Sequence, residues 1–197
     1  MRVYLLRHGE TDWNVVRRVQ GSIDTSLNSV GIRQAESWRP YFDRLHLAGI
    51  YASSLQRALH TATLATGRPA CITPGFDERR FGDWEGILWE ELRTSISNFD
   101  ERWSENSFCP PRGESRCGMF SRVLCALRET VFEHQAGDNV LIVAHGASGH
   151  AILCGLLGHP IEARTNLPVL HNGSLTIAEH RSNQWYLAGQ VPDGVQP

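Results

Sequence analysis

Two short apolar runs stand out in the pattern of hydrophobic and polar positions along the chain. They cover Arg2 to Leu6 and Val140 to Ala144, and turn-forming residues at 137–139 precede the second run. Apolar runs of about four to eight residues between turn signals are typical of strands buried on both faces. The pattern therefore predicts a parallel or mixed sheet covered by helices.

Between and after these runs, apolar residues recur at helical spacing. The segments with this spacing are Ser29 to Leu45, Ser54 to Thr66, Trp89 to Ser97, Arg116 to His134 and Ala147 to Leu157. Strands that alternate with helices predict the α/β class. No linker, repeat or low-complexity segment interrupts the chain, so we expect one domain over residues 1–197, with a mostly parallel, mixed sheet between two helical layers.

The composition removes several classes of enzyme and binding protein. All 19 basic residues are arginine. Without lysine, the chain has neither a Walker-type phosphate loop, nor a Schiff-base lysine for pyridoxal phosphate, nor the strand lysine of a kinase. A net charge of −2 argues against a nucleic-acid partner.

Metal-binding, disulfide and membrane signals are also missing from the sequence. The five cysteines are odd in number and contain no Cys-x-x-Cys pair, and the nine histidines form no His-x-x-x-His cluster. No uninterrupted apolar stretch reaches the roughly 18 residues of a membrane span. We therefore expect a cytoplasmic protein that binds no metal and no membrane.

Both apolar runs end in a His-Gly pair, at the strand ends where parallel sheets bind ligands. Arg7 precedes His8, and its charge disfavours a protonated imidazole while its guanidinium can bind an oxyanion through two hydrogen bonds. Gly9 permits a tight turn. These features favour His8 as a neutral nucleophile facing a phosphate, with His145 in the same pocket. Alternatively, Arg7 and His8 form an ordinary charged strand end, and His145 is structural.

A third basic candidate lies in the segment from Ser53 to Ala58. The segment resembles a strand end followed by a helix with Ser54 as its N-cap, which places Arg57 in the first helical turn. An arginine there opposes the helix dipole, unless its partner is a doubly charged phosphate at the helix N-terminus. A solvated surface arginine is the alternative.

Carboxylates and aromatic residues alternate between residues 76 and 86. Aromatic surroundings favour a carboxyl group that acts as a general acid. The spacing alone does not choose between Glu78, Asp83 and Glu85. Capping or salt-bridge roles are the alternative for Asp83 and Glu85.

Taken in order, these segments resemble the histidine phosphatase superfamily, the phosphoglycerate-mutase-like proteins, and more closely its shorter phosphatase branch. The similarity extends over nearly the whole chain. The matching segments are Leu6 to Thr11 with Trp13 and Asn14, Gln20 and Gly21, Leu27 to Gly31 with Gln34 and Ala35, Ser54 to Ala58 with Thr61 and Ala62, Glu78 to Gly86, Gly113 to Ser115, and His145 with Gly146.

The resemblance implies a phosphoglycerate-mutase-like fold and a phosphomonoesterase that works without a cofactor. His8 would accept the phosphoryl group, Glu78 would be the proton donor, and Glu85 would be structural. Arg7, Arg57, His145 and the side chain of Asn14 would surround the phosphate. The residues expected at the mouth of the pocket are Gln20, Gly21 and the backbone of Ala147.

The sequence departs from the family pattern after His145, where His150 stands near a position that often carries arginine. We expect His150 either to alter substrate preference or to cap a helix. Family mutases tend to have extra segments around the acid, and the region from Glu78 to Trp103 shows no such insertion. Hydrolysis is therefore favoured over a cofactor-dependent mutase reaction, and a non-catalytic phosphate-ester binder is the third alternative.

The substrate itself is open at this stage. We expect a small phosphate monoester, and phosphosugars, phosphorylated hydroxy or amino acids and a nucleotide-loop intermediate all remain candidates. A homodimer is also compatible with the sequence. Candidates for the pocket wall are Trp13, Trp84, Trp103 and Phe108, although aromatic residues are more often core; candidates for a second anion site are Arg79, Arg80 and Arg112.

Overall fold

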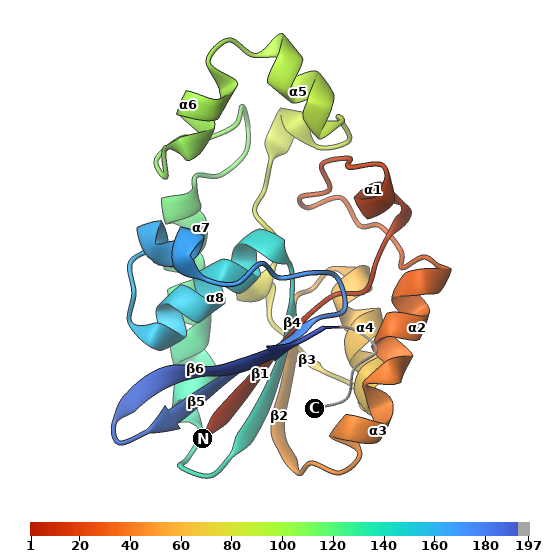
Figure 1. The fold of residues 1–197 in the computed structure, drawn as a ribbon, viewed down its shortest axis with the longest axis vertical. Coiled ribbons are helices and arrows are strands. Elements are labelled where there is room, and N and C mark those ends of the chain that lie inside the picture. Colours follow the sequence, from red (N-terminus) through yellow and green to blue (C-terminus); the bar gives the residue numbers. More distant parts are fainter. Residues whose placement is uncertain (193–197) are drawn as a thin grey trace.

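The computed structural model describes residues 1–192 and contains one six-stranded sheet (Figure 1). The strands lie in the order β3-β2-β4-β1-β5-β6. Their bounds are β1 Arg2–Arg7, β2 Leu47–Ala52, β3 Cys71–Ile72, β4 Asn139–Ala144, β5 Leu175–Arg181 and β6 Gln184–Val191. Strands β1 to β4 are parallel, whereas β5 and β6 run antiparallel to their neighbours. The predicted mixed, mostly parallel sheet is confirmed.

Helices cover both faces of this sheet. The α-helices are α1 Asp12–Val15, α2 Ser29–Ser37, α3 Arg39–Phe42, α4 Gln56–Thr66, α5 Trp89–Ser95, α6 Phe99–Ser104, α7 Arg116–Glu129 and α8 Gly146–Leu157. Four short 3-10 turns join them: η1 Pro74–Phe76, η2 Gly82–Trp84, η3 Val131–Glu133 and η4 Ile161–Asn166. Helices α2, α3 and α4 pack on one face, and α7 and α8 on the other (Figure 1).

Side chains of β1 and β4 alternate between two hydrophobic cores. Val3 and Leu5 join the core under α7 and α8, and Tyr4 and Leu6 join the core under α2 to α4. Every one of these four side chains is at most 1% exposed. The prediction that the apolar runs form strands buried on both faces is therefore confirmed.

A third, mainly aromatic cluster lies apart from the sheet, around α5 and α6 (Figure 1). Its buried members are Val19, Phe81, Trp84, Leu92 and Phe99, and Trp89, Trp103 and Phe108 pack against them. Phe81 stacks on Trp103 with ring centroids 6.0 Å apart. These elements lie above the carboxyl ends of the parallel strands, so they form the outer wall of whatever site those strand ends carry.

Three predicted helices are divided or end earlier than expected. The segment 29–45 is two helices, because the chain bends at Trp38 and α3 begins with Pro40 in its first turn. Helix α7 ends at Glu129, and the rest of the predicted segment to His134 contains η3. Helix α5 ends two residues earlier than expected.

The predicted N-cap of α4 is wrong. The N-cap residue is Leu55, which offers no side-chain hydrogen bond, and the Ser54 hydroxyl donates to the carboxylate of Asp77 at 2.8 Å instead. Arg57 nevertheless lies in the first turn of α4. Of the helices within residues 1–192, none combines the length and the apolar character needed to cross a bilayer. The last five residues of the predicted domain, 193–197, lie outside the described part of the chain.

Candidate active site

The register of the sheet places the two His-Gly pairs side by side. Arg7 pairs with Ala144 in the parallel β1–β4 ladder, so His8 and His145 both follow directly after the last matched pair. The His8 N–H donates to the Ala144 carbonyl at 3.0 Å, and the two imidazole centroids lie 5.1 Å apart. The two histidines therefore lie side by side at the carboxyl end of the sheet.

His8 is held as a neutral imidazole with one free nitrogen. Its Nδ1 lies 2.7 Å from the Gly9 carbonyl oxygen, which can only accept, so Nδ1 carries the proton and Nε2 keeps its lone pair. Burial lowers the pKa of His8 well below its usual value, and the charges of Arg57 and Arg7 lower it further. The free Nε2 is therefore unprotonated at neutral pH and available to a ligand.

Gly9, which we expected to permit a tight turn, is also required by the packing around it. A Cβ on Gly9 would lie only 2.3 Å from the carbonyl oxygen of Gly31 at the start of α2. Glycine is therefore required by the close approach of two backbones, which fixes the turn that carries His8.

Arg57 is buried and bound to the protein on three sides, although the sequence alone left a solvated arginine open. Its Nη2 donates to the Gly21 carbonyl and its Nη1 to the Ile23 carbonyl, each at 2.8 Å, and its Nε to His145 Nδ1 at 3.2 Å. Only 1% of the residue is exposed. Burial lowers the pKa of Arg57 to about 10, so the guanidinium stays charged at neutral pH.

Arg7 supplies a second, partly buried cation with an unused donor. Its Nη1 donates to the Leu170 carbonyl at 2.5 Å. Its Nε is buried without a hydrogen-bond partner among the described residues. A buried, unpaired guanidinium nitrogen costs free energy unless a ligand accepts from it.

Glu78 covers the start of α8 and lines the same cavity as His8. Its Oε1 accepts from the backbone N–H groups of Arg79 at 2.8 Å and Ser148 at 3.0 Å, and its Oε2 from the Ala147 N–H at 3.1 Å. The predicted pocket-mouth amide of Ala147 is thus already occupied by the predicted acid. A carboxylate at this helix N-terminus stands where an anionic ligand would also be stabilised.

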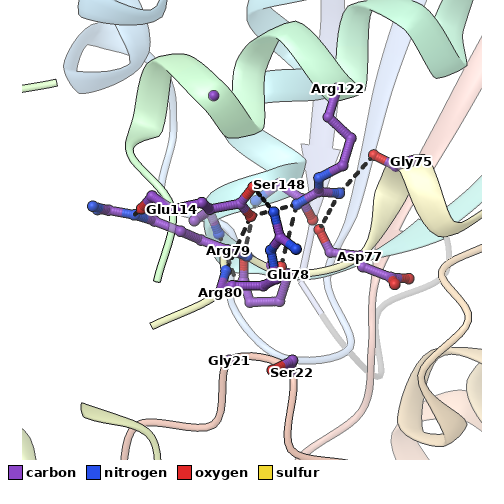
Figure 2. Close-up of polar contacts among 12 residues, drawn as sticks. Gly21, Ser22, Gly75, Asp77, Glu78, Arg79, Arg80, Glu114, Arg122 and Ser148 are labelled. Atoms are coloured by element: carbon purple, nitrogen blue, oxygen red, sulfur yellow. Dashed lines mark hydrogen bonds and ion pairs between the residues drawn. The ribbon is translucent and has the colours of Figure 1, made fainter. Parts of the chain in front are cut away.

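The segment that carries Glu78 is clamped from α7, as Figure 2 shows. Arg122 donates to the carbonyls of Gly75 at 2.9 Å, Asp77 at 3.1 Å and Glu78 at 3.3 Å. The same guanidinium forms a 2.7 Å ion pair with the nearly buried Glu114, whose Oε1 also accepts from the Arg80 N–H. The backbone of Glu78 is therefore fixed by a charged pair that itself does not line the cavity.

The loop with Gln20 and Gly21 holds Arg57, because the Gly21 carbonyl accepts from its guanidinium. Gly21 has a positive φ of 54°, and a Cβ there would collide with the Glu85 carboxylate. Glu85 accepts from the Ser22 N–H at 2.9 Å and from the Phe81 N–H at 2.9 Å. Glu85 therefore has the structural contacts that the resemblance implied.

Asn14 and Gln20 have their amide oxygens occupied within the protein. Asn14 Oδ1 accepts from the Thr11 N–H and from Asn172 Nδ2, and Gln20 Oε1 accepts from the Thr11 and Thr25 hydroxyls. Because the oxygens are fixed in this way, the NH₂ groups of both side chains are the atoms left to face a ligand.

These residues share one cavity with a volume of about 220 Å³. Its lining consists of Arg7, His8, Asn14, Arg18, Val19, Gln20, Gly21, Arg57, Glu78, Phe81, Trp89, Trp103 and Ala147. Every predicted site residue lines it except His145, which lies behind Arg57 and is 1% exposed. Within residues 1–192, no three His, Cys, Asp or Glu side chains gather in an arrangement that could hold a metal ion.

The remaining candidates divide between the wall and the core. Trp103 lines the cavity, whereas Trp84 and Phe108 pack in the aromatic cluster and Trp13 lies beneath the Arg18 guanidinium. Of the candidate anion-binding arginines, Arg79 is fully buried against Trp103, Arg80 pairs with Glu114, and Arg112 pairs with Asp83. None of these three lines the cavity.

His150 lies inside α8 and is not a helix cap, so its contacts differ from the capping alternative. Its ring nitrogens lie 3.0 Å from the Gly146 carbonyl and 3.1 Å from the Pro168 carbonyl. It joins the first turn of α8 to the segment before β5 and does not line the cavity.

Sequence reasoning missed Asn172 and Arg122. Asn172 Nδ2 donates to the His8 carbonyl at 3.1 Å and to Asn14 Oδ1 at 3.2 Å. The Asn-Gly dipeptide at 172–173 is a local turn signal that could have identified this residue. Arg122 lies inside a helix, where no local pattern distinguishes it from a surface arginine.

Comparisons with known proteins agree with this geometry. The sequence profile of the histidine phosphatase superfamily (branch 1) matches residues 3–191. A protein from Yersinia pestis (strain Pestoides F) named "Probable phosphoglycerate mutase GpmB" is 32% identical over 200 residues, which cover 97% of this chain and 90% of the relative.

Two solved structures of phosphatases share the fold. A mycobacterial glucosyl-3-phosphoglycerate phosphatase in complex with VO3 has a TM-score of 0.85 and 30% identity, covering 94% of this chain and 96% of that one. The alpha-ribazole phosphatase from Shigella flexneri has a TM-score of 0.84 and 27% identity, with both chains covered completely. The chain therefore belongs to branch 1 of the histidine phosphatase superfamily and is an enzyme of the histidine phosphatase type.

Proposed function

We propose that this protein is a phosphomonoesterase that works through a phosphohistidine on His8, without a metal ion or an organic cofactor. One observation carries the proposal. The unprotonated Nε2 of His8 shares a cavity with the guanidinium groups of Arg7 and Arg57 and with the carboxylate of Glu78. A neutral imidazole, two fixed cations and one carboxylic acid are the groups that a metal-free phosphoryl transfer requires.

The reaction takes two steps. His8 Nε2 attacks phosphorus and the bond from phosphorus to the alcohol oxygen breaks, while Glu78, in its protonated form, gives its proton to the departing oxygen. Water then attacks the phosphohistidine and loses a proton to the Glu78 carboxylate. Breakage of the N–P bond releases inorganic phosphate and restores both side chains.

The arginines stabilise the charge that develops on the transferred group. The unpaired Nε of Arg7 and the remaining N–H groups of Arg57 are donors on two residues that line the cavity. Because these donors are fixed before the reaction, each can contribute about 10²- to 10³-fold in rate. Asn14 would add a neutral donor through its NH₂ group.

A small phosphate monoester is the substrate that fits the cavity. A volume of about 220 Å³ lies below the range of most drug-sized ligand pockets. The names of the two solved relatives place phosphorylated small molecules among the substrates of proteins with this fold. We propose that this chain also hydrolyses such an ester.

The second candidate is a mutase that returns the phosphoryl group to its substrate. The similarity to the Yersinia relative favours it. The short 3-10 turn and the two short helices between Glu78 and Trp103 provide no long insertion over the cavity that would exclude water. We therefore place hydrolysis first.

Chelator-treated protein tests both candidates. Wild type and His8→Ala are incubated with a panel of phosphate monoesters that includes 3-phosphoglycerate, with and without a bisphosphorylated primer. Hydrolysis predicts release of inorganic phosphate that is independent of primer and lost in His8→Ala. Primer-dependent isomerisation without phosphate release would favour the mutase, and a strict need for added metal would contradict the proposed mechanism.

A further inference from the structure

A chain of hydrogen bonds leads from a carboxylate to the second histidine of the site. Asp77 Oδ1 lies 2.8 Å from the Ser53 hydroxyl, and that hydroxyl lies 2.7 Å from His145 Nε2. Ser53 is fully buried, at the end of β2, and His145 is 1% exposed. These hydrogen bonds therefore connect Asp77, which precedes the proposed acid Glu78 in the sequence, through Ser53 to the imidazole of His145.

The positions of the protons in this chain are fixed from both ends. An ionised Asp77 can only accept, so the Ser53 hydroxyl donates to it and must accept from His145 Nε2–H. At the other side of the ring, the Arg57 Nε–H can only donate, so His145 Nδ1 must accept. Both ends independently select the neutral Nε2–H tautomer of His145.

This assignment has a consequence for the phosphate site. With Nε2–H bound to Ser53 and Nδ1 unprotonated, the resting ring has no proton to donate toward a bound phosphate. It must take a proton on Nδ1 before it can become a donor to the transferred group.

We propose that Ser53 and Asp77 are positioning residues that hold His145 in the Nε2–H tautomer and stabilise it as an imidazolium when the phosphate of the substrate binds. The inference rests on the proposed function for the identity of the ligand. The proton comes from the hydroxyl of a phosphate monoanion: its O–H bond breaks, an N–H bond forms at His145 Nδ1, and the phosphate becomes a dianion. Arg57 Nε then donates to that dianion instead of to the ring.

The surrounding charges explain why the imidazolium needs this support. Burial lowers the pKa of His145 well below its usual value. Charged neighbours lower it further: Arg57 of α4, His8 and Arg7 at the end of β1, and Arg122 of α7. The carboxylates on the other side are Asp77 and Glu78. Arrival of the anionic phosphate beside Arg57 adds negative charge to the cavity on the Nδ1 side of the ring, while Asp77 compensates the positive charge of the imidazolium through Ser53.

Asp77 has enough other partners to remain in place when the link is cut. It accepts from the Ser54 N–H at 2.7 Å and from the Ser54 hydroxyl at 2.8 Å, and its carbonyl accepts from Arg122. Ser54 therefore provides a matched control. Ser54→Ala removes a hydroxyl from the same carboxylate without touching the link to His145. Ser53→Ala removes the link together with one backbone contact, because the Ser53 oxygen also accepts from the Leu55 N–H at 3.2 Å.

The experiment follows the ring nitrogens of His145 by NMR in ¹⁵N-histidine-labelled full-length protein, with inorganic phosphate as the probe and His145→Gln for assignment. In wild type we expect the Nε2–H tautomer at rest and protonation of both nitrogens at saturating phosphate. Ser53→Ala should lose the single tautomer and bind phosphate about 10- to 100-fold more weakly, the loss expected for a charge-assisted hydrogen bond. Asp77→Asn should keep the tautomer and lose the phosphate-induced protonation, and Ser54→Ala should match wild type.

Three results would overturn the inference. One is a wild-type ring whose Nδ1 stays unprotonated at saturating phosphate. Another is a Ser53→Ala protein with unchanged tautomer and affinity, and the third is a Ser54→Ala protein that loses as much as Ser53→Ala. The readout is the tautomer of His145, so a failed inference about Ser53 and Asp77 would leave turnover through His8 intact. A failed proposed function would instead appear as absent turnover, with the contacts of Asp77, Ser53 and His145 unaffected.

Discussion

Glu78→Gln separates the chemical role of this side chain from its structural contacts. The carboxylate accepts three backbone N–H groups, from Arg79, Ala147 and Ser148. Glutamine has one acceptor oxygen, which can keep the Arg79 and Ser148 bonds that both end on Oε1. Only the Ala147 contact at Oε2 would face an NH₂ group, so the variant should fold.

The expected loss of activity depends on the leaving group. For an alkyl phosphate, whose departing alkoxide is strongly basic, loss of the general acid should lower kcat/KM by about 10²- to 10⁴-fold. For p-nitrophenyl phosphate, whose leaving group needs no proton to depart, the loss in the first step should be less than about tenfold. Removal of a negative charge from the cavity and release of the Ala147 amide should at the same time tighten the binding of inorganic phosphate.

The assay compares kcat/KM for the two esters in wild type, Glu78→Gln and Glu85→Gln. Glu85 is the matched control, because its carboxylate holds Ser22 and Phe81 beside the same cavity. Its replacement should change both esters by the same factor. Equal losses for both esters in Glu78→Gln, or a leaving-group dependence in Glu85→Gln, would refute the assignment of Glu78 as the acid.

Three further predictions follow from the packing and charge of the site. Because His8 and His145 stay neutral when folded and gain protons when unfolded, stability should be lost as pH falls below about 6.5, by about 1.4 kcal/mol per pH unit for each ring. Chemical denaturation at several pH values measures how the free energy of unfolding changes with pH. That slope should be smaller by about 1.4 kcal/mol per pH unit in His8→Gln and unchanged in the exposed control His159→Gln. Gly9→Ala should cost about 3 kcal/mol in urea denaturation, since its Cβ would lie 2.3 Å from a backbone oxygen, and a cost under about 1 kcal/mol would contradict this. Arg122→Met should leave the nearly buried Glu114 with only its longer, 3.6 Å pair to the exposed Arg80, cost about 3 kcal/mol and lower kcat more than it raises KM; unchanged steady-state kinetics would show that the clamp does not position Glu78.

The sequence was sufficient for the features that depend on local pattern. The apolar runs before His8 and His145 predicted two buried strands, and their parallel pairing then required the two histidines to meet. The spacing of the family segments identified Arg7, Arg57 and Glu78, which the structure gathers around one cavity.

Long-range contacts explain what the sequence could not predict. The Ser54 hydroxyl donates to Asp77, which lies 23 positions further along the chain, so the predicted N-cap hydrogen bond of Ser54 does not form. The burial of Arg57 depends on carbonyls 36 and 34 positions away, in a loop with no regular pattern. The hairpin of β5 and β6 was not anticipated, because its outer strand is largely exposed and lacks a buried apolar run.

The central claim is that the phosphoryl group passes through His8. Wild type mixed with excess phosphate monoester and quenched within milliseconds should carry one added phosphoryl group, stable in base and lost in acid, on the peptide that contains His8. His8→Ala should show none, while Glu78→Gln should accumulate it from p-nitrophenyl phosphate because the second step lacks its base. A phosphorylated peptide elsewhere in the chain, or full turnover by His8→Ala, would contradict the account.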